Sequence, residues 1–248
     1  MRRLIRADLK RLTKKKILWI FLAVSYIVTI GLVIGVSRVG TLDGNALMTT
    51  LKNTTILQLL VGTAILLSVY GDEFRSMALT TLIGRGFSRT KIIIAKFLDA
   101  MILVAFVYLI YYIGLSLIIL VSRVGMTPFE RWTLISSAIC GAYSMFGHII
   151  IASFFLFLTG NVTISVFVYV FLETVVPAVT MFVKSNAFIA KFHLDRFNFE
   201  GLGRMAFTDF LLGQNGGAVF KLVLGLVLFA GVFLAATAIY FGRKELDF

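Results

Sequence analysis

The sequence predicts an all-α, polytopic membrane protein with six transmembrane helices, and three observations carry this prediction. Of the 248 residues, 59% are hydrophobic and only 15% are charged, whereas soluble globular domains carry about 25% charged residues. Six apolar stretches are each close to the roughly 20 residues that a helix needs to cross a bilayer. The basic residues cluster beside these stretches, as in cytoplasmic anchors of membrane proteins. The surface of such a chain must face lipid.

The six expected spans share an apolar composition and a length that suits a membrane-crossing helix. They cover residues 17–36, 55–71, 93–121, 133–157, 161–183 and 219–241. The second span is short, and the third is long enough to tilt. The first is not expected to be a cleaved signal peptide, because its apolar region is too long and no A-x-A site follows it. No linker or clear repeat divides the chain, so residues 1–248 are expected to form a single transmembrane domain.

The distribution of Lys and Arg predicts the orientation of these spans. Fifteen of the 24 basic residues precede the first span, lie between the second and third spans or follow the last one, and nine lie on the opposite side. Because cytoplasmic loops carry the excess of Lys and Arg, both termini are expected on the cytoplasmic face of the plasma membrane. The net charge of +12 then indicates contact with anionic lipid rather than with nucleic acid.

Two segments outside the spans are expected to form amphipathic helices. Residues 1–16 place Leu4, Ile5, Leu9 and Leu12 on one helical face and basic residues on the other, which suits a helix in the headgroup plane. The alternative is a frayed basic tail. The segment 184–218 mixes aromatic and charged residues, which favours short amphipathic or re-entrant helices at the outer face. Its Gly213, Gly216 and Gly217 then permit the turn into the last span.

The segment 72–86 is expected to form a short cytoplasmic helix between the second and third spans. Apolar and small residues recur there at helical spacing: Phe74, Met77, Ala78, Thr81 and Leu82. Asp72 and Glu73 occupy the first turn, where negative charge complements the helix dipole, and Gly84 and Gly86 can end the helix. The alternative is a basic loop that only anchors the topology. A helix with its own start and stop signals is more than anchoring requires.

Motifs for nucleotide, metal or nucleophile chemistry are not found in the sequence. The stretch "GRGFSRTK" at 84–91 lacks the spacing of a phosphate-binding loop. Cys140 is the single cysteine, and His148 and His193 stand 45 positions apart outside any H-E-x-x-H motif. No serine nucleophile elbow is recognisable. The chain is therefore expected to hold no catalytic, cofactor or metal site and not to be an enzyme.

Three ionisable residues fall within the expected spans, and such residues are functional candidates by default. Asp99 is expected to pair locally with Lys96 near the cytoplasmic interface. His148 is expected to be a neutral, hydrogen-bonded core residue rather than a proton relay. Glu173, which precedes Pro177 by four residues, lines a translocation path, pairs across a subunit interface or reaches the outer headgroups. The three groups are expected to be isolated from one another, so that none has a matched second acid, which argues against a proton pump or a protease.

Gly31 and Gly35 form a G-x-x-x-G pattern in the first span. Small residues at this spacing permit close approach of two membrane helices. The pattern is common in glycine-rich membrane chains, so an interhelical packing role and a chance match remain equal alternatives.

The stretch "DEFRSMALTTLIGRGFSRTKIIIAKF" resembles the cytoplasmic segment of the ABC transporter type-2 permease family, found in bacitracin, lantibiotic-immunity and other small bacterial exporters. The family pattern is an acid after the second span, a helix, a break, Ser-Arg and a lysine leading into the third span. The corresponding residues here are Glu73, the helix through Ile83, Ser88-Arg89 and Lys96. The chain departs from the family at Met77-Ala78, where Gly-Thr is common, and at Gly86-Phe87, where proline is common. In outline the resemblance covers the whole chain.

This resemblance implies a transporter subunit without its motor. In the family the 72–86 segment is the coupling helix, which docks on a separate ATP-binding subunit that binds ATP and Mg, and two permeases join two ATPases. The implied docking residues are Glu73, Phe74, Arg75, Met77 and Leu82, with Arg85, Arg89 and Lys91 pairing with acids of the ATPase or with lipid. The implied function is export of an amphipathic or hydrophobic substrate, first of all an antimicrobial or toxic peptide.

Several alternatives stay open at this point. Lipid or drug export fits the same pattern, and the second permease copy is either identical or a sister chain. From another class, a membrane-embedded enzyme or protease-like protein would need a catalytic pair at depth. An ion channel would need a polar pore-lining stripe, and none is evident in the sequence.

Overall fold

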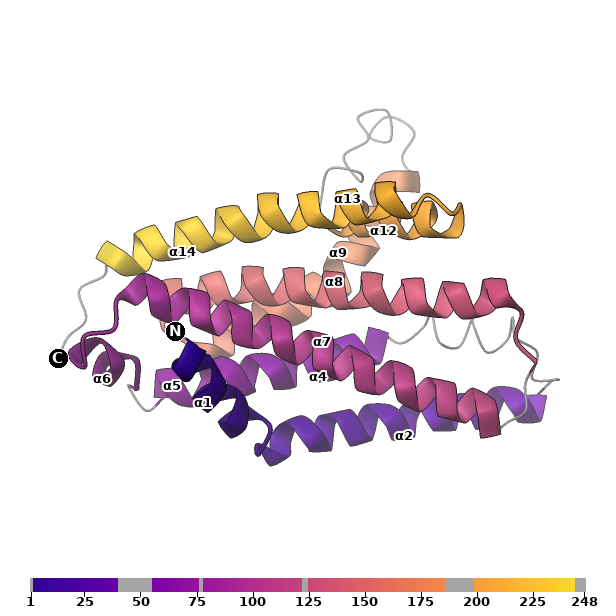
Figure 1. Ribbon diagram of the computed structural model, residues 1–248, viewed down its shortest axis with the longest axis horizontal. Helices are drawn as coiled ribbons and strands as arrows, with labels where there is room; N and C mark the ends of the chain where they lie inside the picture. The colour runs from indigo at the N-terminus through magenta and orange to yellow at the C-terminus, as the bar shows by residue number, and fades with distance from the viewer. Residues whose placement is uncertain (1, 40–54, 76–77, 122–124, 186–198, 244–248) are drawn as a thin grey trace.

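The computed structural model describes residues 2–39, 55–75, 78–121, 125–185 and 199–243. All regular secondary structure in these ranges is helical, and most helices run along the long axis of the molecule (Figure 1). The elements, in chain order, are α1 (Arg2–Leu12), α2 (Lys16–Val39), α4 (Thr55–Leu66), η1 (Leu67–Gly71), α5 (Asp72–Arg75), α6 (Ala78–Gly84), α7 (Arg89–Val121), α8 (Pro128–Thr159), α9 (Val162–Ser185), α12 (Phe199–Leu211), α13 (Asn215–Gly225), η2 (Leu226–Ala230) and α14 (Gly231–Arg243). The expected all-α class is therefore confirmed for the described residues.

The expected number of six spans is confirmed only in part. Four helical stretches of the described residues are long and apolar enough to cross a membrane: α7, α8, Val162–Val179 of α9 and Asn215–Gly242. A fifth arises if α1 and α2, which meet at an angle of 55°, form one bent span. The remaining expected span, the second (55–71), corresponds to α4 and η1. That stretch is apolar and helical, but it is shorter than the roughly 20 residues that a bilayer requires.

The core is built around α8, which packs against α4, α7, α9, α12 and α14. In Figure 1, α8 lies between α14 above it and α7 below it. The buried face of α8 includes Met145, Ile149, Ala152 and Leu156, which recur at helical spacing and are at most 1% exposed. Large apolar side chains on the outer helices are instead exposed, as at Phe167 (70%) of α9. An exposed apolar surface of this kind suits contact with lipid.

Local signals in the sequence fix both ends of α8. The Thr127 side chain accepts a hydrogen bond from the Glu130 backbone N–H, and the Glu130 carboxylate accepts one from the Thr127 N–H. This reciprocal arrangement is a capping box, and Pro128 adds a favourable residue in the first turn. At the other end Gly160 has a φ of 72°, a left-handed conformation that favours glycine. These signals place the helix around which the core is built.

The short helix expected over 72–84 is described in two parts. These are α5 and α6, and residues 76–77 between them lie outside the description. As expected, α6 ends at Gly84, and Gly86 then has a φ of 85°. The N–H groups of Gly86 and Phe87 bond to the carbonyls of Ile83 and Leu82, the pattern of a helix C-cap.

The N-terminal and outer segments contain the predicted helices. Within the expected 1–16 segment α1 forms a helix over Arg2–Leu12, although its position in the headgroup plane stays a prediction. In the 184–218 segment α12 is a helix, and Gly213 makes the turn with a φ of 75°. Gly216 and Gly217 instead belong to α13. Residues 186–198 lie outside the description.

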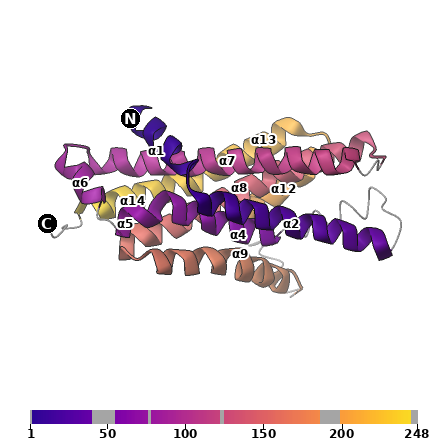
Figure 2. The same cartoon turned by 90° about the horizontal axis from the view of Figure 1, so that it is seen from below.

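The N-terminal helix α1, the α5–α6 segment and the end of α14 lie at one end of the elongated molecule (Figures 1 and 2). The N-terminus of α8 lies toward the opposite end. The predicted cytoplasmic segments therefore share one end of the fold, and this arrangement positions the first of the two sites described next.

Candidate functional site

A buried group of opposite charges joins α1, α5 and α7 at the end of the molecule that carries α6. Glu73 opens the acidic first turn of α5 together with Asp72, and it is only 3% exposed. Its Oε1 accepts hydrogen bonds from Arg11 Nη2 and from Lys96 Nζ, each at 2.5 Å. Lys96 of α7 is fully buried. Burying these charges is tolerable only because they pair with one another.

Two further carboxylates complete this group, which we term the ion cluster: Asp8, Arg11, Glu73, Lys96 and Asp99. Asp8 Oδ2 lies 2.7 Å from Lys96 Nζ. Asp99 Oδ2 lies 4.0 Å from the same nitrogen, so the expected local pair is present at the limit of ion-pair distance. The stronger partners of Lys96 come from α1 and α5. The sequence predicted the pair within α7 but not these contacts between helices.

The start of α5 is also fixed beside the ion cluster. Lys15, which lies between α1 and α2, places its Nζ 2.7 Å from Asp72 Oδ2 and donates a hydrogen bond to the Ser68 carbonyl oxygen at 2.5 Å. The C-terminal half of α1 and the turn that follows it are thus tied to α5 and to the stretch that leads into it. A short helix held at several points in this way moves with its neighbours.

The residues expected to dock on a partner divide into buried and exposed positions. Glu73 belongs to the ion cluster, and Phe74 packs edge-to-face on Phe157 with ring centroids 5.3 Å apart. Leu82 is half-buried against the main core. Arg85 is exposed at the end of α6. Phe87, which sequence reasoning did not select, is an exposed aromatic residue (36%) in the turn that follows.

Of three other expected docking residues, only Arg89 has a described side chain. Arg89 Nη1 donates hydrogen bonds to the carbonyl oxygens of Phe241, at 2.8 Å, and Gly242, at 3.2 Å. Its guanidinium also lies over the Phe241 ring, 5.7 Å from the centroid. Arg89 therefore holds the C-terminal end of α14. The Arg75 side chain and Met77 lie outside the described part of the chain.

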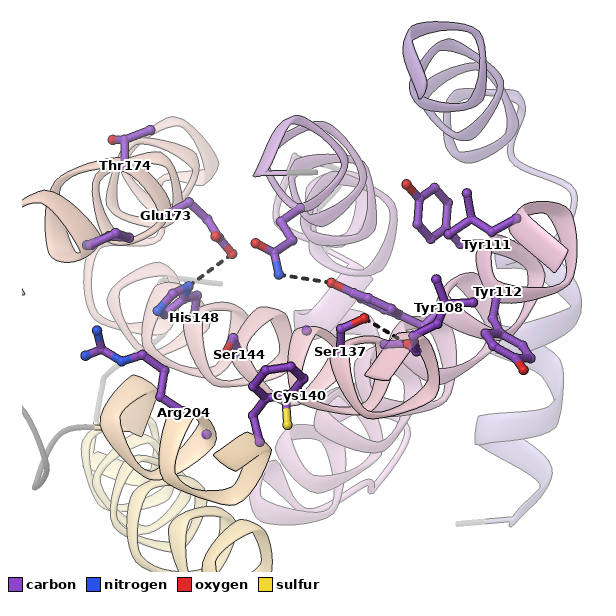
Figure 3. Close-up of a pocket in the computed structure, with 18 residues that line it drawn as sticks. Tyr108, Tyr111, Tyr112, Ser137, Cys140, Ser144, His148, Glu173, Thr174 and Arg204 are labelled. Atoms are coloured by element: carbon purple, nitrogen blue, oxygen red, sulfur yellow. Dashed lines mark hydrogen bonds and ion pairs between the residues drawn. The ribbon is translucent and has the colours of Figure 1, made fainter. Parts of the chain in front are cut away.

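The second site is a cavity of about 620 Å³ between α4, α7, α8, α9 and α12. Figure 3 shows His148, Glu173 and Arg204 toward one end and Tyr108, Tyr111 and Tyr112 toward the other. Ligand pockets typically have volumes of roughly 300–1,000 Å³ and are mostly apolar with a few polar groups. The cavity has both properties. Neither Arg204 nor the three tyrosines were selected from the sequence, because their meeting at one cavity depends on how the helices pack.

His148 and Glu173 meet at this cavity, which corrects the expectation that they are isolated. His148 Nδ1 lies 3.0 Å from Glu173 Oε1, and the two residues are only 4% and 3% exposed. They come from α8 and α9, which run side by side. Spacing in the sequence could not reveal this pair, since 25 residues and a helix reversal separate the two positions.

The Glu173 carboxylate also belongs to a chain of polar contacts across the helices. The Tyr169 hydroxyl lies 2.9 Å from Glu173 Oε1 and 2.6 Å from the Gln58 carbonyl oxygen, so its single proton serves two acceptors. Gln58 Nε2 in turn donates to the Tyr108 hydroxyl at 3.2 Å. The ring of Tyr169 fits because residue 62 is glycine: an added Cβ there would lie 1.8 Å from the hydroxyl.

Arg204 borders the same end of the cavity from α12. Its Nη2 is buried and has no hydrogen-bond partner in the part of the chain that the structure describes. A buried guanidinium N–H that lacks an acceptor is costly. The cavity therefore contains a paired carboxylate and an incompletely paired cation.

Gly31 and Gly35 lie on an open face of α2. A Cβ added at either glycine would meet no atom within 4 Å in this chain. Within the described residues, the G-x-x-x-G pattern therefore makes no close helix contact, and its packing role stays a prediction.

Comparisons with known proteins do not assign the chain to a family. No protein-family model matches the chain, and no curated protein matches it. Within the described residues, no three His, Cys, Asp or Glu side chains are grouped so that they could hold a metal ion.

Proposed function

We propose that the chain is the permease subunit of an ATP-binding cassette exporter and that the 72–86 segment docks on a separate ATPase subunit. The observation that carries this proposal is the attachment of α5 to α1 and α7 through the ion cluster, next to exposed residues at the end of α6. A segment that transmits force needs an exposed contact and a rigid connection to the spans. The resemblance of the segment to the coupling helix of type-2 permeases supports the same proposal.

The contacts suggest that the residues of the docking segment have two different roles. Arg85 and Phe87 are exposed and offer a positive charge and an aromatic ring to a partner. Glu73 and Phe74 face inward, so their role is to position the segment rather than to touch the ATPase. Motion of α6 then passes through Glu73 and Lys96 to α7, whose tyrosines line the cavity. Such motion biases the cavity between two conformations.

The proposed complex contains two permease chains and two ATPase chains in the plasma membrane, with both termini in the cytoplasm. ATP and Mg bind to the ATPase subunits. The second permease is an identical or a sister chain, and lipid surrounds the apolar helices. The exported substrate is amphipathic or hydrophobic, and a toxic or antimicrobial peptide is the first class to examine.

The test is co-purification from the native host in a mild detergent, followed by mass spectrometry. We expect an ATP-binding cassette subunit to co-purify with the unmodified chain and to be lost from Arg85→Glu and Phe87→Ala. Arg131→Glu is the matched control, because Arg131 is also exposed and lies in the first turn of α8, toward the opposite end of the fold. Recovery of the unmodified chain without any ATPase would overturn the proposal.

A membrane-embedded hydrolase is a second candidate, favoured by the buried His148–Glu173 pair beside Cys140 and Ser144. A histidine oriented by a carboxylate can activate a nucleophile when the two share a hydrogen bond. Among the described residues His148 has no hydrogen bond to Ser144 or Cys140, so the permease is preferred. Covalent labelling of Ser144 by a fluorophosphonate, abolished in His148→Ala, would reverse this preference.

A further inference from the structure

Two buried side-chain nitrogens at the charged end of the cavity have no hydrogen-bond partner among the described residues: His148 Nδ1, which lies close to Glu173, and Arg204 Nη2, the one of the two that carries a permanent charge. Glu173 Oε1 already lies 2.9 Å from the Tyr169 hydroxyl and 3.0 Å from His148 Nδ1. Arg204 Nη2 is buried without an acceptor among the described residues. Buried polar groups in proteins are almost always hydrogen-bonded, to protein, to water or to a ligand. An acceptor is therefore what this end of the cavity lacks.

A guanidinium selects particular acceptors. It is planar and permanently charged, and its parallel N–H groups match the two oxygens of a carboxylate or a phosphate. An ammonium group would gain nothing from Arg204 and would be repelled by it. The existing contacts to Glu173 reduce the attraction that this carboxylate offers to a cation, because its hydrogen-bonding capacity is partly used. The charged end thus favours an anionic oxygen group.

The remainder of the cavity suits an apolar body. Toward the other end the walls include Tyr108, Tyr111 and Tyr112 of α7 (Figure 3). Leu115 and Leu134 also line the cavity. Aromatic side chains bury large apolar areas while their hydroxyls remain hydrogen-bonded. A cavity of about 620 Å³ holds a headgroup and a substantial apolar segment. The polar and apolar ends are arranged as the two ends of an amphiphile.

We infer that this cavity binds an amphiphile with an anionic headgroup, a carboxylate or a phosphate, which pairs with Arg204 while the apolar body lies along the tyrosines. As a statement about the exported substrate, this inference rests on the proposed function, whose substrate class it narrows. As a binding site, it concerns the isolated chain alone. A free carboxylate terminus of an apolar peptide and the phosphate of a lipid present the same chemistry to Arg204.

The test compares four ligands that share one tail: dodecanoate, dodecyl phosphate, dodecanol and dodecylamine. Their binding to the purified full-length chain is measured by equilibrium titration in a maltoside detergent, which carries no charge. We expect at least one of the two anions to bind on the order of ten- to a hundredfold tighter than dodecanol, the range of one charged hydrogen-bonded contact. Preference for dodecanoate identifies a carboxylate ligand such as a peptide terminus. Preference for dodecyl phosphate identifies a lipid-like phosphate.

Substitution then assigns this gain to one side chain. Arg204→Gln should reduce the affinity for the anions to that of dodecanol, and Arg204→Lys should retain part of the gain because it keeps the charge without the planar fork. Arg6→Gln is the control, since Arg6 is exposed on α1 and its substitution removes the same charge at a distant position. If Arg204→Gln does not fold, the four-ligand series on the unmodified chain still decides.

Two results would overturn the inference. Equal binding of all four ligands would show that only the apolar walls bind. Tightest binding of dodecylamine, lost in Glu173→Gln, would show a cation site. Because no ATPase takes part in these titrations, failure here is distinguishable from failure of the proposed function, which is decided by co-purification.

Discussion

Glu73 Oε1 and Lys96 Nζ lie 2.5 Å apart, and this contact joins the first turn of α5 to the fully buried side of α7. Asp8 and Arg11 approach the same pair from α1. The three elements therefore share one set of charges, and none of them can shift without separating buried ions. This relationship gives the short α5–α6 segment a rigid connection to the longest helix of the described chain.

Removal of the central cation is predicted to destabilise the protein severely. Lys96→Met leaves the carboxylates of Glu73 and Asp8 buried and close together without their shared ammonium group. Breaking a buried ion pair from one side costs about 3–5 kcal/mol, so the free energy of unfolding should fall by an amount of that order. Thermal unfolding of the purified protein in detergent, followed by circular dichroism, measures the change.

The control for this prediction is Lys91→Met on the same helix. Lys91 is exposed, and its substitution should leave the unfolding temperature nearly unchanged. The double variant Lys96→Met/Glu73→Gln should recover part of the loss, because Arg11 then has one carboxylate fewer to balance in the ion cluster. Equal unfolding temperatures for Lys96→Met and Lys91→Met would mean that the ion cluster does not hold these helices together.

A second prediction concerns the contact between Gly62 and Tyr169. In Gly62→Ala the new Cβ would lie 1.8 Å from the Tyr169 hydroxyl and 2.2 Å from its Cζ, so the ring must move. The tyrosine would then lose its contacts with Glu173 and Gln58. Overpacking of this kind costs about 1–3 kcal/mol, and unfolding of the purified variant should show a loss of this size.

Matched variants separate this steric effect from the general effect of alanine in a helix. Gly31→Ala adds a Cβ that meets no atom within 4 Å, so it should be neutral or slightly stabilising through helix propensity. Gly62→Ala/Tyr169→Leu should lose less stability than the sum of its two single variants, because leucine vacates the space. Strict additivity of the two changes would count against the close contact.

A third prediction separates Arg89 from Arg85, which lie four residues apart in the same basic segment. Arg89→Gln removes two hydrogen bonds to the carbonyls that end α14. Hydrogen bonds from charged groups contribute about 1.5–3 kcal/mol each. Partial solvent exposure of the two Arg89 bonds reduces their contribution. Backbone amides of the last turns of α14 should exchange with deuterium faster in this variant. In Arg85→Gln the same amides should exchange at the unmodified rate, and equal acceleration in both variants would contradict the capping role.

The helices could be predicted from the sequence because their signals are local. The α8 capping residues, Gly86 and Gly213 act on their own neighbours, and the expected helices begin and end close to them. The second expected span, 55–71, has the bounds of α4 and η1 together, but apolar composition alone does not show whether so short a stretch crosses a membrane.

The candidate sites could be predicted only in part, because they are built from residues far apart in the sequence. Glu73 and Lys96 were selected individually, but their contact with α1 depends on where the bend between α1 and α2 directs Asp8 and Arg11. In the same way, intramembrane charge drew attention to His148 and Glu173, whereas their pairing requires α8 and α9 to align. Arg204 carried no such signal, because its segment, 184–218, was expected to lie outside the six spans.

The last prediction concerns the open face of α2. Gly31 and Gly35 form a small-residue stripe that contacts nothing within the described chain, and such stripes allow two membrane helices to pack closely. If the second permease copy packs there, Gly31→Leu/Gly35→Leu should lower the dimer fraction measured by crosslinking in native membranes. The unfolding temperature of the monomer in detergent should stay unchanged, because leucine at these positions meets no neighbour. Gly231→Leu is the control, since Gly231 is also exposed in a helix with open space around it. An equal dimer fraction in both variants would place the subunit contact on another face.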